Sequence, residues 1–151
     1  MNCNNRIYLC GPITGLTIKE ASEYRDKIKE MFAETGILTL DPMRGKYHIE
    51  SDEPICAVGY VSGSHDDKAI VKRDKHDVMN CALMLADFTN SKQISIGSMV
   101  EFGWADAMGI PIVTVLPKGN LHDHCFVRQL STYVVEDIEE AVQLALTIID
   151  I

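Results

Sequence analysis

Two segments that are apolar except for Asp87 and Thr114, at residues 82–88 and 110–116, constrain the fold of this chain more than any other feature. Strands without alternating polar side chains are buried on both faces, which is typical of parallel sheets covered by helices. Further strands are predicted at 6–10, 37–40 and 132–137, and helices at 17–36, 66–81, 98–109, 122–130 and 137–149. The alternation predicts a single-domain, Rossmann- or flavodoxin-like α/β fold, with about five parallel strands and helices on both faces.

Length and charge limit the possible functions. The 151 residues are most simply one domain, spanning 1–151. The 22 acidic against 14 basic residues, a net charge of -8, argue against a nucleic-acid polymer as partner but not against a single nucleoside or nucleotide. No segment approaches the roughly 20 apolar residues of a membrane span. The five cysteines are scattered and form no C-x-x-C pair, and the N-terminal residues do not have the pattern of a signal peptide. Both observations favour reduced thiols in the cytoplasm.

Ligands of such sheets bind beyond the carboxyl ends of the strands, near the switch in strand order. Four segments are expected to meet there: 11–15, 43–65, 89–97 and the loop that follows residue 116. The segment 43–65 is the longest irregular one, and loops of this length are often binding loops or lids.

Glu101 is the first candidate for chemistry in the stretch "SIGSMVEFGWADAMG". We expect it in the first turns of a helix that follows Gly97, where free N–H groups and the helix dipole favour an ionised carboxylate. Simple compensation of that dipole is the alternative. The neighbouring Met99, Val100 and Phe102 indicate partial burial, and a partly buried carboxylate requires a partner or a function.

Three other side chains could each have either a structural or a functional role. Tyr8, near the end of the first strand, is either a core aromatic or a phenol that reaches the cleft to bind a carboxylate. Asp74 lies in the helical segment "KRDKHD", either on a solvated face or facing the sheet edge as a second carboxylate. Asp87 ends a strand on the ligand side and could equally cap the following loop.

Cofactor and metal sites are not supported by the motifs. The loop "GPITG" lacks the G-x-G-x-x-G spacing of a dinucleotide fingerprint. The H-x-H motif of His122 and His124 could bind a metal, but no Cys or Glu at ligand spacing completes a site. We therefore expect neither a cofactor nor a metal.

Taken together, these segments resemble the nucleoside 2-deoxyribosyltransferase superfamily. "IYLCGPITG" is similar to its first strand and loop, "RDKHDVMNCALMLADFT" to its helix–strand unit, and "SIGSMVEFGWA" to its nucleophile segment. The resemblance covers most of the chain apart from the long loop. It implies that Glu101 attacks C1′ of a deoxyribose and expels the base, and that an incoming base resolves the glycosyl-enzyme with retention.

The same resemblance assigns roles to further residues. Asp74 contacts or protonates the base, and Tyr8 supports the ionised nucleophile. The small residues Gly97 and Ser98 let the sugar approach the backbone. The remaining substrate-binding residues that it implies lie in the first loop and before the nucleophile helix, namely Gly11, Pro12, Ile13 and Ser95.

The superfamily has two branches, and the sequence departs from both. Transferases that act on free nucleosides often carry an aspartate where this chain has Ser95, whereas nucleoside 5′-monophosphate N-glycosidases carry a serine there. Those hydrolases also use a serine and an arginine in the first loop, at positions that here are Pro12 and Thr14. Lys72, Arg73 or His124 could substitute in holding a phosphate. We favour a nucleoside deoxyribosyltransferase, with the N-glycosidase and a non-catalytic nucleotide-sensing module as alternatives.

The segment "HCFVRQ" is similar to the part that a neighbouring subunit lends to the active site in this superfamily. The resemblance implies a homo-oligomer, in which His124 and Phe126 reach a neighbour's cleft. Packing within the chain, with Phe126 under its own sheet and His124 at the surface, is the alternative. The partners expected are thus a nucleoside or nucleotide, a free nucleobase and further copies of the chain.

Overall fold

The computed structural model describes residues 5–44, 52–56 and 66–149. Its five strands are β1 (Arg6–Cys10), β2 (Leu38–Leu40), β3 (Leu83–Asp87), β4 (Ile112–Val115) and β5 (Tyr133–Val135). All pair in parallel, in the order β2-β1-β3-β4-β5. The predicted α/β fold with a five-stranded parallel sheet is confirmed, and the strand order is the flavodoxin-like one.

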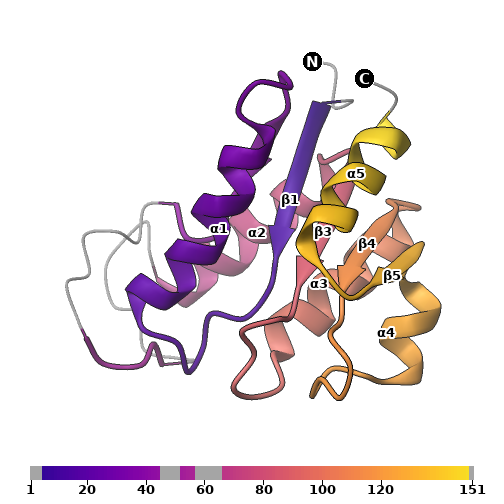
Figure 1. The fold of residues 1–151 in the computed structure, drawn as a ribbon. Coiled ribbons are helices and arrows are strands. Elements are labelled where there is room, and N and C mark those ends of the chain that lie inside the picture. Colours follow the sequence, from indigo (N-terminus) through magenta and orange to yellow (C-terminus); the bar gives the residue numbers. More distant parts are fainter. Residues whose placement is uncertain (1–4, 45–51, 57–65, 150–151) are drawn as a thin grey trace.

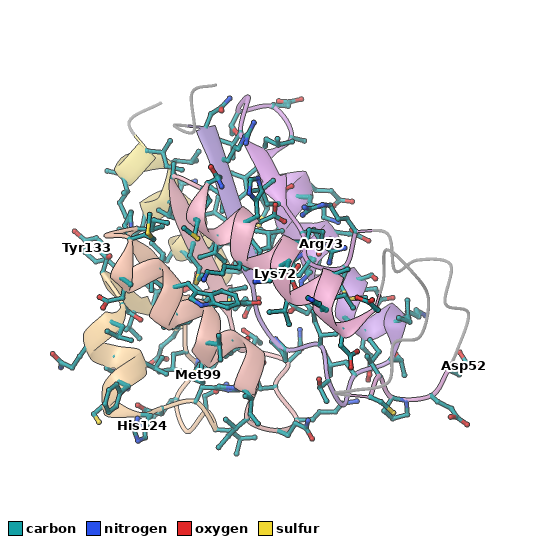
Figure 2. The ribbon with its side chains drawn as sticks, turned by 180° about the vertical axis from the view of Figure 1, so that it is seen from behind. Asp52, Lys72, Arg73, Met99, His124 and Tyr133 are labelled. Carbon is teal, nitrogen blue, oxygen red and sulfur yellow. The ribbon has the colours of Figure 1, made fainter. Side chains whose placement is uncertain are left out.

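Helices cover both faces of the sheet (Figure 1). The helices are α1 (Ile18–Phe32), α2 (Asp67–Met79), α3 (Ile96–Ala107), α4 (Cys125–Leu130) and α5 (Ile138–Ile149). One core lies between the sheet and α1 and α5, and a second lies between the sheet and α2, α3 and α4. Figure 2 views the second face, with Lys72 and Arg73 on α2, Met99 on α3 and His124 just before α4.

Alternation along β1 decides which side chains reach which core. Ile7 and Leu9 point to α1 and α5, whereas Tyr8 and Cys10 point to the opposite face, toward α2 and α3. Successive side chains of a strand point to opposite faces of the sheet, so Tyr8 and Cys10 share one face. This places a phenol and a thiol under the two helices that carry the candidate acids.

The helix ends largely follow the predicted signals. Thr17 and Glu20 form the expected capping box at the start of α1. Asp137 caps α5 through a bond from the Glu140 N–H at 2.8 Å. The start of α3 is a correction, because the helix begins at Ile96 with Ser95 as its N-cap, two residues before the predicted start. The serine hydroxyl accepts the Ser98 N–H, so a side chain that could satisfy the helix end determines where the helix begins.

The structure bears on two further expectations, the absence of a membrane span and the binding loop at 43–65. Within the described ranges, no helix is long and apolar enough to cross a membrane. Most of the predicted binding loop at 43–65 lies outside the described residues. Its described part includes Ile55, whose backbone bonds Gly15 and Leu16 at 3.0 and 2.8 Å, so residues near 55 lie against the first loop.

Candidate active site

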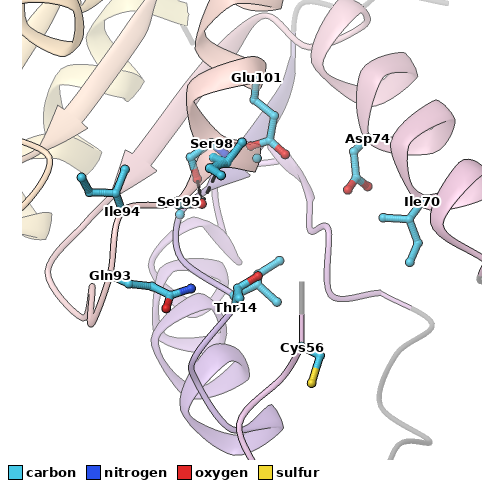
Figure 3. A pocket seen from close by; sticks show the side chains of 13 residues that line it. Thr14, Cys56, Ile70, Asp74, Gln93, Ile94, Ser95, Ser98 and Glu101 are labelled. Carbon is cyan, nitrogen blue, oxygen red and sulfur yellow. Dashed lines mark hydrogen bonds between the residues drawn. The ribbon is translucent and has the colours of Figure 1, made fainter. Parts of the chain in front are cut away.

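A pocket of about 410 Å³ opens beyond the carboxyl ends of the strands, beside the switch in strand order. After β1 the chain adds β2 on one side and then returns to place β3 on the other. Such switch points are where open α/β sheets bind their ligands. The pocket (Figure 3) is lined by Gly11, Ile13, Thr14, Cys56, Ile70, Asp74, Gln93, Ile94, Ser95, Ile96, Gly97, Ser98 and Glu101.

Glu101 lies deeper in its helix than the sequence suggested. Because α3 begins at Ile96, Glu101 is the sixth helical residue, and Gly97 lies inside the helix. The unsatisfied N–H groups of a helix belong to its first turn. The expectation that free N–H groups at the helix start would hold Glu101 ionised is therefore wrong. Its side chain points into the pocket instead (Figure 3).

Tyr8 donates a hydrogen bond to the carboxylate of Glu101. The phenol donates to Oε1 of Glu101 at 2.9 Å, across 93 positions of the sequence. Tyr8 is also completely buried in the core that underlies α3. Burial and the charge of Glu101 raise the pKa of Tyr8 well above its ordinary value, so the phenol keeps its proton and remains a donor. Tyr8 is therefore a core aromatic that also binds a carboxylate, although it does not itself line the pocket.

The environment of Glu101 opposes its ionisation. Its pKa is raised from 4.5 to about 7, first by burial and then by the nearby Asp74 carboxylate. Hydrogen bonds from the Cys10 thiol and the Tyr8 phenol act in the opposite direction. A carboxyl group with a pKa near neutrality can change protonation state at physiological pH, which is a property of groups with a catalytic task.

Asp74 belongs to the pocket rather than to a solvated helix face. It comes from the middle of α2, it is buried, and it lines the pocket opposite Glu101 (Figure 3). Its Oδ1 accepts bonds from Nε and a terminal nitrogen of Arg73 at 3.2 and 3.1 Å. The pocket thus holds two carboxylates from two different helices.

The first loop contributes two of its three predicted residues. Gly11 and Ile13 line the pocket, but Pro12 does not, which corrects the expectation for Pro12. The carbonyl of Pro12 accepts bonds from the Tyr24 hydroxyl at 3.0 Å and from Arg25 at 3.3 Å. These donors from α1 hold the loop carbonyl in the protein interior.

Gly11 is required because its surroundings leave no space for a side chain. A Cβ atom there would lie 2.6 Å from the hydroxyl of Tyr24 and 2.7 Å from the carbonyl of Asp87. Asp87 itself accepts the Thr89 N–H at 2.9 Å, so it caps the loop after β3 and does not line the pocket. Of the two interpretations of Asp87, the loop cap is correct.

The start of α3 forms the wall next to the nucleophile candidate. Ser95, Gly97 and Ser98 all line the pocket, as predicted. The hydroxyl groups of Ser95 and Ser98 lie 2.9 Å apart, within hydrogen-bond distance. The Ser95 N–H donates to Nε2 of His122 at 2.8 Å. Hydroxyl groups and exposed backbone at this wall are suited to contact a sugar.

His124 and Phe126 do not reach this pocket within the chain. They line a separate hollow of about 600 Å³ between α3 and α4, and their rings stack with centroids 5.8 Å apart. The Phe126 side chain is 67% exposed, so the alternative that it packs under its own sheet is wrong. A large exposed aromatic ring beside an apolar hollow is typical of an interaction surface.

The H-x-H motif does not converge on one point. His122 is buried and bonds to Ser95 and Asn120, whereas His124 is exposed and caps α4. Within residues 5–44, 52–56 and 66–149, no three His, Cys, Asp or Glu side chains are grouped so that they could hold a metal ion. His48 and His65 lie outside the described residues.

Several residues of the site escaped sequence reasoning. Cys10 could have been found, because it lies two positions after Tyr8 in a strand and so shares its face. Arg25 and His122 act across long sequence separations, and no local pattern indicates them. The remaining pocket residues that were not singled out for substrate binding are Thr14, Cys56, Ile70, Gln93, Ile94 and Ile96.

Comparison with known proteins gives the site a context. Residues 7–144 match the family described as nucleoside 2-deoxyribosyltransferase. Searching the curated proteins gave no match. Among solved structures, CMP N-glycosidase BcmB from Clostridium botulinum is 19% identical, with a TM-score of 0.57, and the alignment covers 94% of this chain and 98% of that one.

Two solved transferases are also similar to this chain. The 2-deoxyribosyltransferase from Bacillus psychrosaccharolyticus is 16% identical with a TM-score of 0.65, covering 89% of this chain and 88% of that one. The corresponding enzyme from Leishmania mexicana is 17% identical with a TM-score of 0.62, covering 95% and 97%. At these identities the shared property is the fold.

Proposed function

The chain belongs to the nucleoside 2-deoxyribosyltransferase family, and we propose that it exchanges the base of a (deoxy)nucleoside through a covalent glycosyl-enzyme on Glu101. The observation that carries this proposal is the enclosed Glu101 carboxyl group, held by Tyr8 at 2.9 Å and facing Asp74 in the pocket. A nucleophile, a donor that orients it and a second acid are the groups that cleavage of an N-glycosidic bond with retention requires.

The first step forms a bond between a carboxylate oxygen of Glu101 and C1′ and breaks the bond from C1′ to the base nitrogen. The bonding electrons leave with the base, which needs a proton or a hydrogen bond to become a good leaving group. We assign this role to Asp74, which in its protonated form passes a proton to the base from the opposite side of the pocket and becomes a carboxylate. The Tyr8 phenol, which stays protonated, orients the attacking carboxylate.

The second step reverses the first with a different base. A nitrogen of the incoming base attacks C1′, the ester bond to Glu101 breaks, and the carboxylate is regenerated. Asp74 accepts the proton that the incoming base loses, and two inversions give overall retention. Glu101 must be ionised at the start, and its pKa of about 7 allows this near neutral pH.

The charge of the pocket favours a free nucleoside over a 5′-monophosphate. Its described lining holds two acids, Asp74 and Glu101, and no Lys, Arg or His. Arg73 is engaged by Asp74 and by the carbonyl groups of Pro42 and Arg44, and Lys72 is exposed. Among the described residues of the pocket, a phosphate dianion would meet like charge without a cationic partner, which is unfavourable in a partly enclosed site.

A nucleoside 5′-monophosphate N-glycosidase is the second candidate. The observation that favours it is the wall formed by the start of α3, where Ser95 rather than a carboxylate is the N-cap. Helix N-termini are favourable places for a phosphate. In such an enzyme water would resolve the glycosyl-enzyme in place of a second base.

One set of incubations separates these functions. The purified protein is incubated with deoxyinosine and free adenine, then with deoxyadenosine, and then with deoxycytidine monophosphate alone, and products are separated by chromatography. We expect deoxyadenosine from the first mixture. Free base from the monophosphate without exchange would favour the hydrolase. Absence of turnover in every incubation would contradict both and favour a nucleotide-sensing module.

We also propose that the site is completed by a second copy of the chain. The support is the exposed pair His124 and Phe126, which line an apolar hollow outside their own pocket. His124→Ala should raise KM without a change in Tm. Mixing this variant with Glu101→Ala should restore activity above the sum of the two, once subunit exchange is verified by labelled chains. Exchange without recovery would show that each site is built from one chain.

A reducing compartment, the cytoplasm, fits this proposal. Cys10, Cys56, Cys81 and Cys125 are free thiols, two of them exposed. Exposed free thiols persist where the environment keeps them reduced.

A further inference from the structure

The residue that supports the start of α3 comes from a distant part of the chain. His122 lies in the loop between β4 and α4, and only 2% of its surface is exposed. Its Nε2 accepts the backbone N–H of Ser95 at 2.8 Å. Ser95 is the N-cap of α3, and the N–H groups at a helix start have no partner within the helix. The imidazole therefore satisfies a donor at the wall of the pocket.

The hydrogen bonds on both sides of the ring determine its protonation state. A backbone N–H can only donate, so Nε2 must carry no proton, and in the neutral ring the proton lies on Nδ1. Nδ1 faces Oδ1 of Asn120 at 3.3 Å. That oxygen also accepts the His122 N–H at 2.9 Å, so it is the acceptor end of the amide. A neutral Nδ1–H imidazole fits every one of these contacts, and a protonated ring does not.

Asn120 and the ring are in turn anchored to the sheet. The amide nitrogen of Asn120 donates to the carbonyl of Phe88 at 2.8 Å, directly after β3. The ring of Phe88 stacks on that of His122, with centroids 4.1 Å apart and planes 13° from parallel. The sheet thus fixes the ring, and the ring fixes the N–H of Ser95.

Charged neighbours leave the ring neutral. Asp123, the next residue, is turned toward Arg128, which binds its two carboxylate oxygens at 2.6 and 2.9 Å. Burial lowers the pKa of His122 below its ordinary value. The ring therefore stays an acceptor across the neutral pH range, as the bond to Ser95 requires.

We propose that His122 is a positioning residue, which as a neutral acceptor fixes Ser95 and with it the sugar-facing wall formed by the start of α3. Ser95 and Ser98 line the pocket and are linked to each other, whereas Glu101 is held separately by Tyr8 from β1. Loss of the acceptor should therefore disturb substrate binding more than the chemical step. The kinetic part of this inference rests on the proposed function, and the protonation state of the ring does not.

Two substitutions at one position test the role of the acceptor. His122→Phe keeps a ring to stack on Phe88 but removes the acceptor, and His122→Gln returns an oxygen at similar reach. One hydrogen bond of this kind is worth about 1.4 kcal/mol, or about tenfold. We expect His122→Phe to raise KM for the deoxynucleoside about tenfold with a smaller change in kcat, and His122→Gln to restore most of the loss. His76→Gln, on the exposed face of α2, is the control.

Equal KM values for wild type and His122→Phe, equal damage in the Phe and Gln variants, or loss of kcat without a change in KM would overturn the proposal. Nitrogen NMR of the wild-type protein gives a second test that needs no variant and no activity. We expect the Nδ1–H tautomer of His122 throughout pH 6–8, and an Nε2–H tautomer or a protonated ring in that range would overturn the proposal. If the tautomer is as expected but no nucleoside is turned over, the proposed function fails and the positioning of Ser95 stands.

Discussion

Two of the carboxylates inside the molecule, Asp41 and Glu101, are in opposite electrostatic environments. Asp41 follows β2 on the side of α1, and Glu101 projects from α3 on the other side of the sheet. Burial alone would raise the pKa of both. The pKa of Asp41 is nevertheless lowered, whereas that of Glu101 is raised to about 7.

The difference lies in the partners. Asp41 binds Nζ of Lys29 at 2.5 Å and accepts the Met43 N–H at 2.7 Å, and Nε of Arg25 lies 3.6 Å away. Glu101 has neutral donors, the phenol of Tyr8 and the thiol of Cys10, and a second carboxylate nearby. Two cations stabilise the charge of Asp41, whereas for Glu101 the charge of Arg25 lowers the pKa less than burial and Asp74 raise it. One carboxylate is thus built for stability and the other for reactivity.

Substitution of Glu101 should give the largest effect. We expect Glu101→Gln to lower kcat by at least about 10⁴-fold, because the covalent step needs the ionised carboxylate. The exchange of deoxyinosine with adenine measures this, and Glu139→Gln, an exposed glutamate on α5, is the control. Activity near that of wild type in Glu101→Gln would end the assignment of the nucleophile.

The same variant should be more stable than wild type in alkaline solution. The folded pKa of about 7 exceeds the unfolded value of 4.5, so the fold loses stability as pH rises through this range. Removing the charge should recover about 2 kcal/mol at pH 8 and little at pH 4. Urea unfolding at the two pH values measures this difference. A loss of stability at pH 8 would show that Glu101 is a structural acid like Asp41.

Asp74→Asn should come next in size. We expect cleavage to slow by about 10²- to 10⁴-fold, the usual contribution of a general acid, and to slow most for bases that are poor leaving groups. Rates for a series of nucleosides with different bases measure the trend. Asp67→Asn, on the same helix, is the control. Wild-type rates for every base would return Asp74 to the role of a structural charge.

Asp41→Asn should reverse the pattern of Glu101→Gln. The change removes the buried anion that Lys29 and Arg25 share, although Lys29 keeps the more exposed Asp26 at 2.9 Å, and it should cost about 3 kcal/mol of unfolding free energy at pH 7. Because the pKa of Asp41 is lowered, its contribution is present above the unfolded pKa and is lost as pH falls through the folded one. The kcat of the folded fraction should be unchanged. A large loss of kcat would break the separation between the two carboxylates.

Tyr8→Phe should give the smallest effect. It removes one hydrogen bond to the carboxylate, worth about 1.5 kcal/mol, so the rate should fall about tenfold. In wild type, kcat/KM should fall with acid below pH about 7, as Glu101 becomes protonated. The pKa of Glu101 should rise further in Tyr8→Phe, which shifts this acid limb to higher pH. An unchanged pH profile would leave Tyr8 with its core role only.

The sequence by itself was enough to predict the parallel sheet and to select the two carboxylates of the candidate site. Predominantly apolar strands separated by helical patterns leave few arrangements other than a covered parallel sheet, because each strand must be buried on both faces. Glu101 stands out as a charge in an apolar helix and Tyr8 as a polar group near the ligand edge of a sheet, whereas Asp74 lies among other charges and was singled out by the family resemblance. Residue identity and spacing are enough for such signals.

Tertiary structure alone decided how these residues are used. Whether Pro12 faces the pocket depends on Tyr24 and Arg25 in α1, and the support of Ser95 depends on His122, 27 positions away. The raised pKa of Glu101 depends on its enclosure between β1, α2 and α3, not on its place in the helix. Hydrogen bonds and desolvation act through space, and local sequence patterns record only neighbours along the chain.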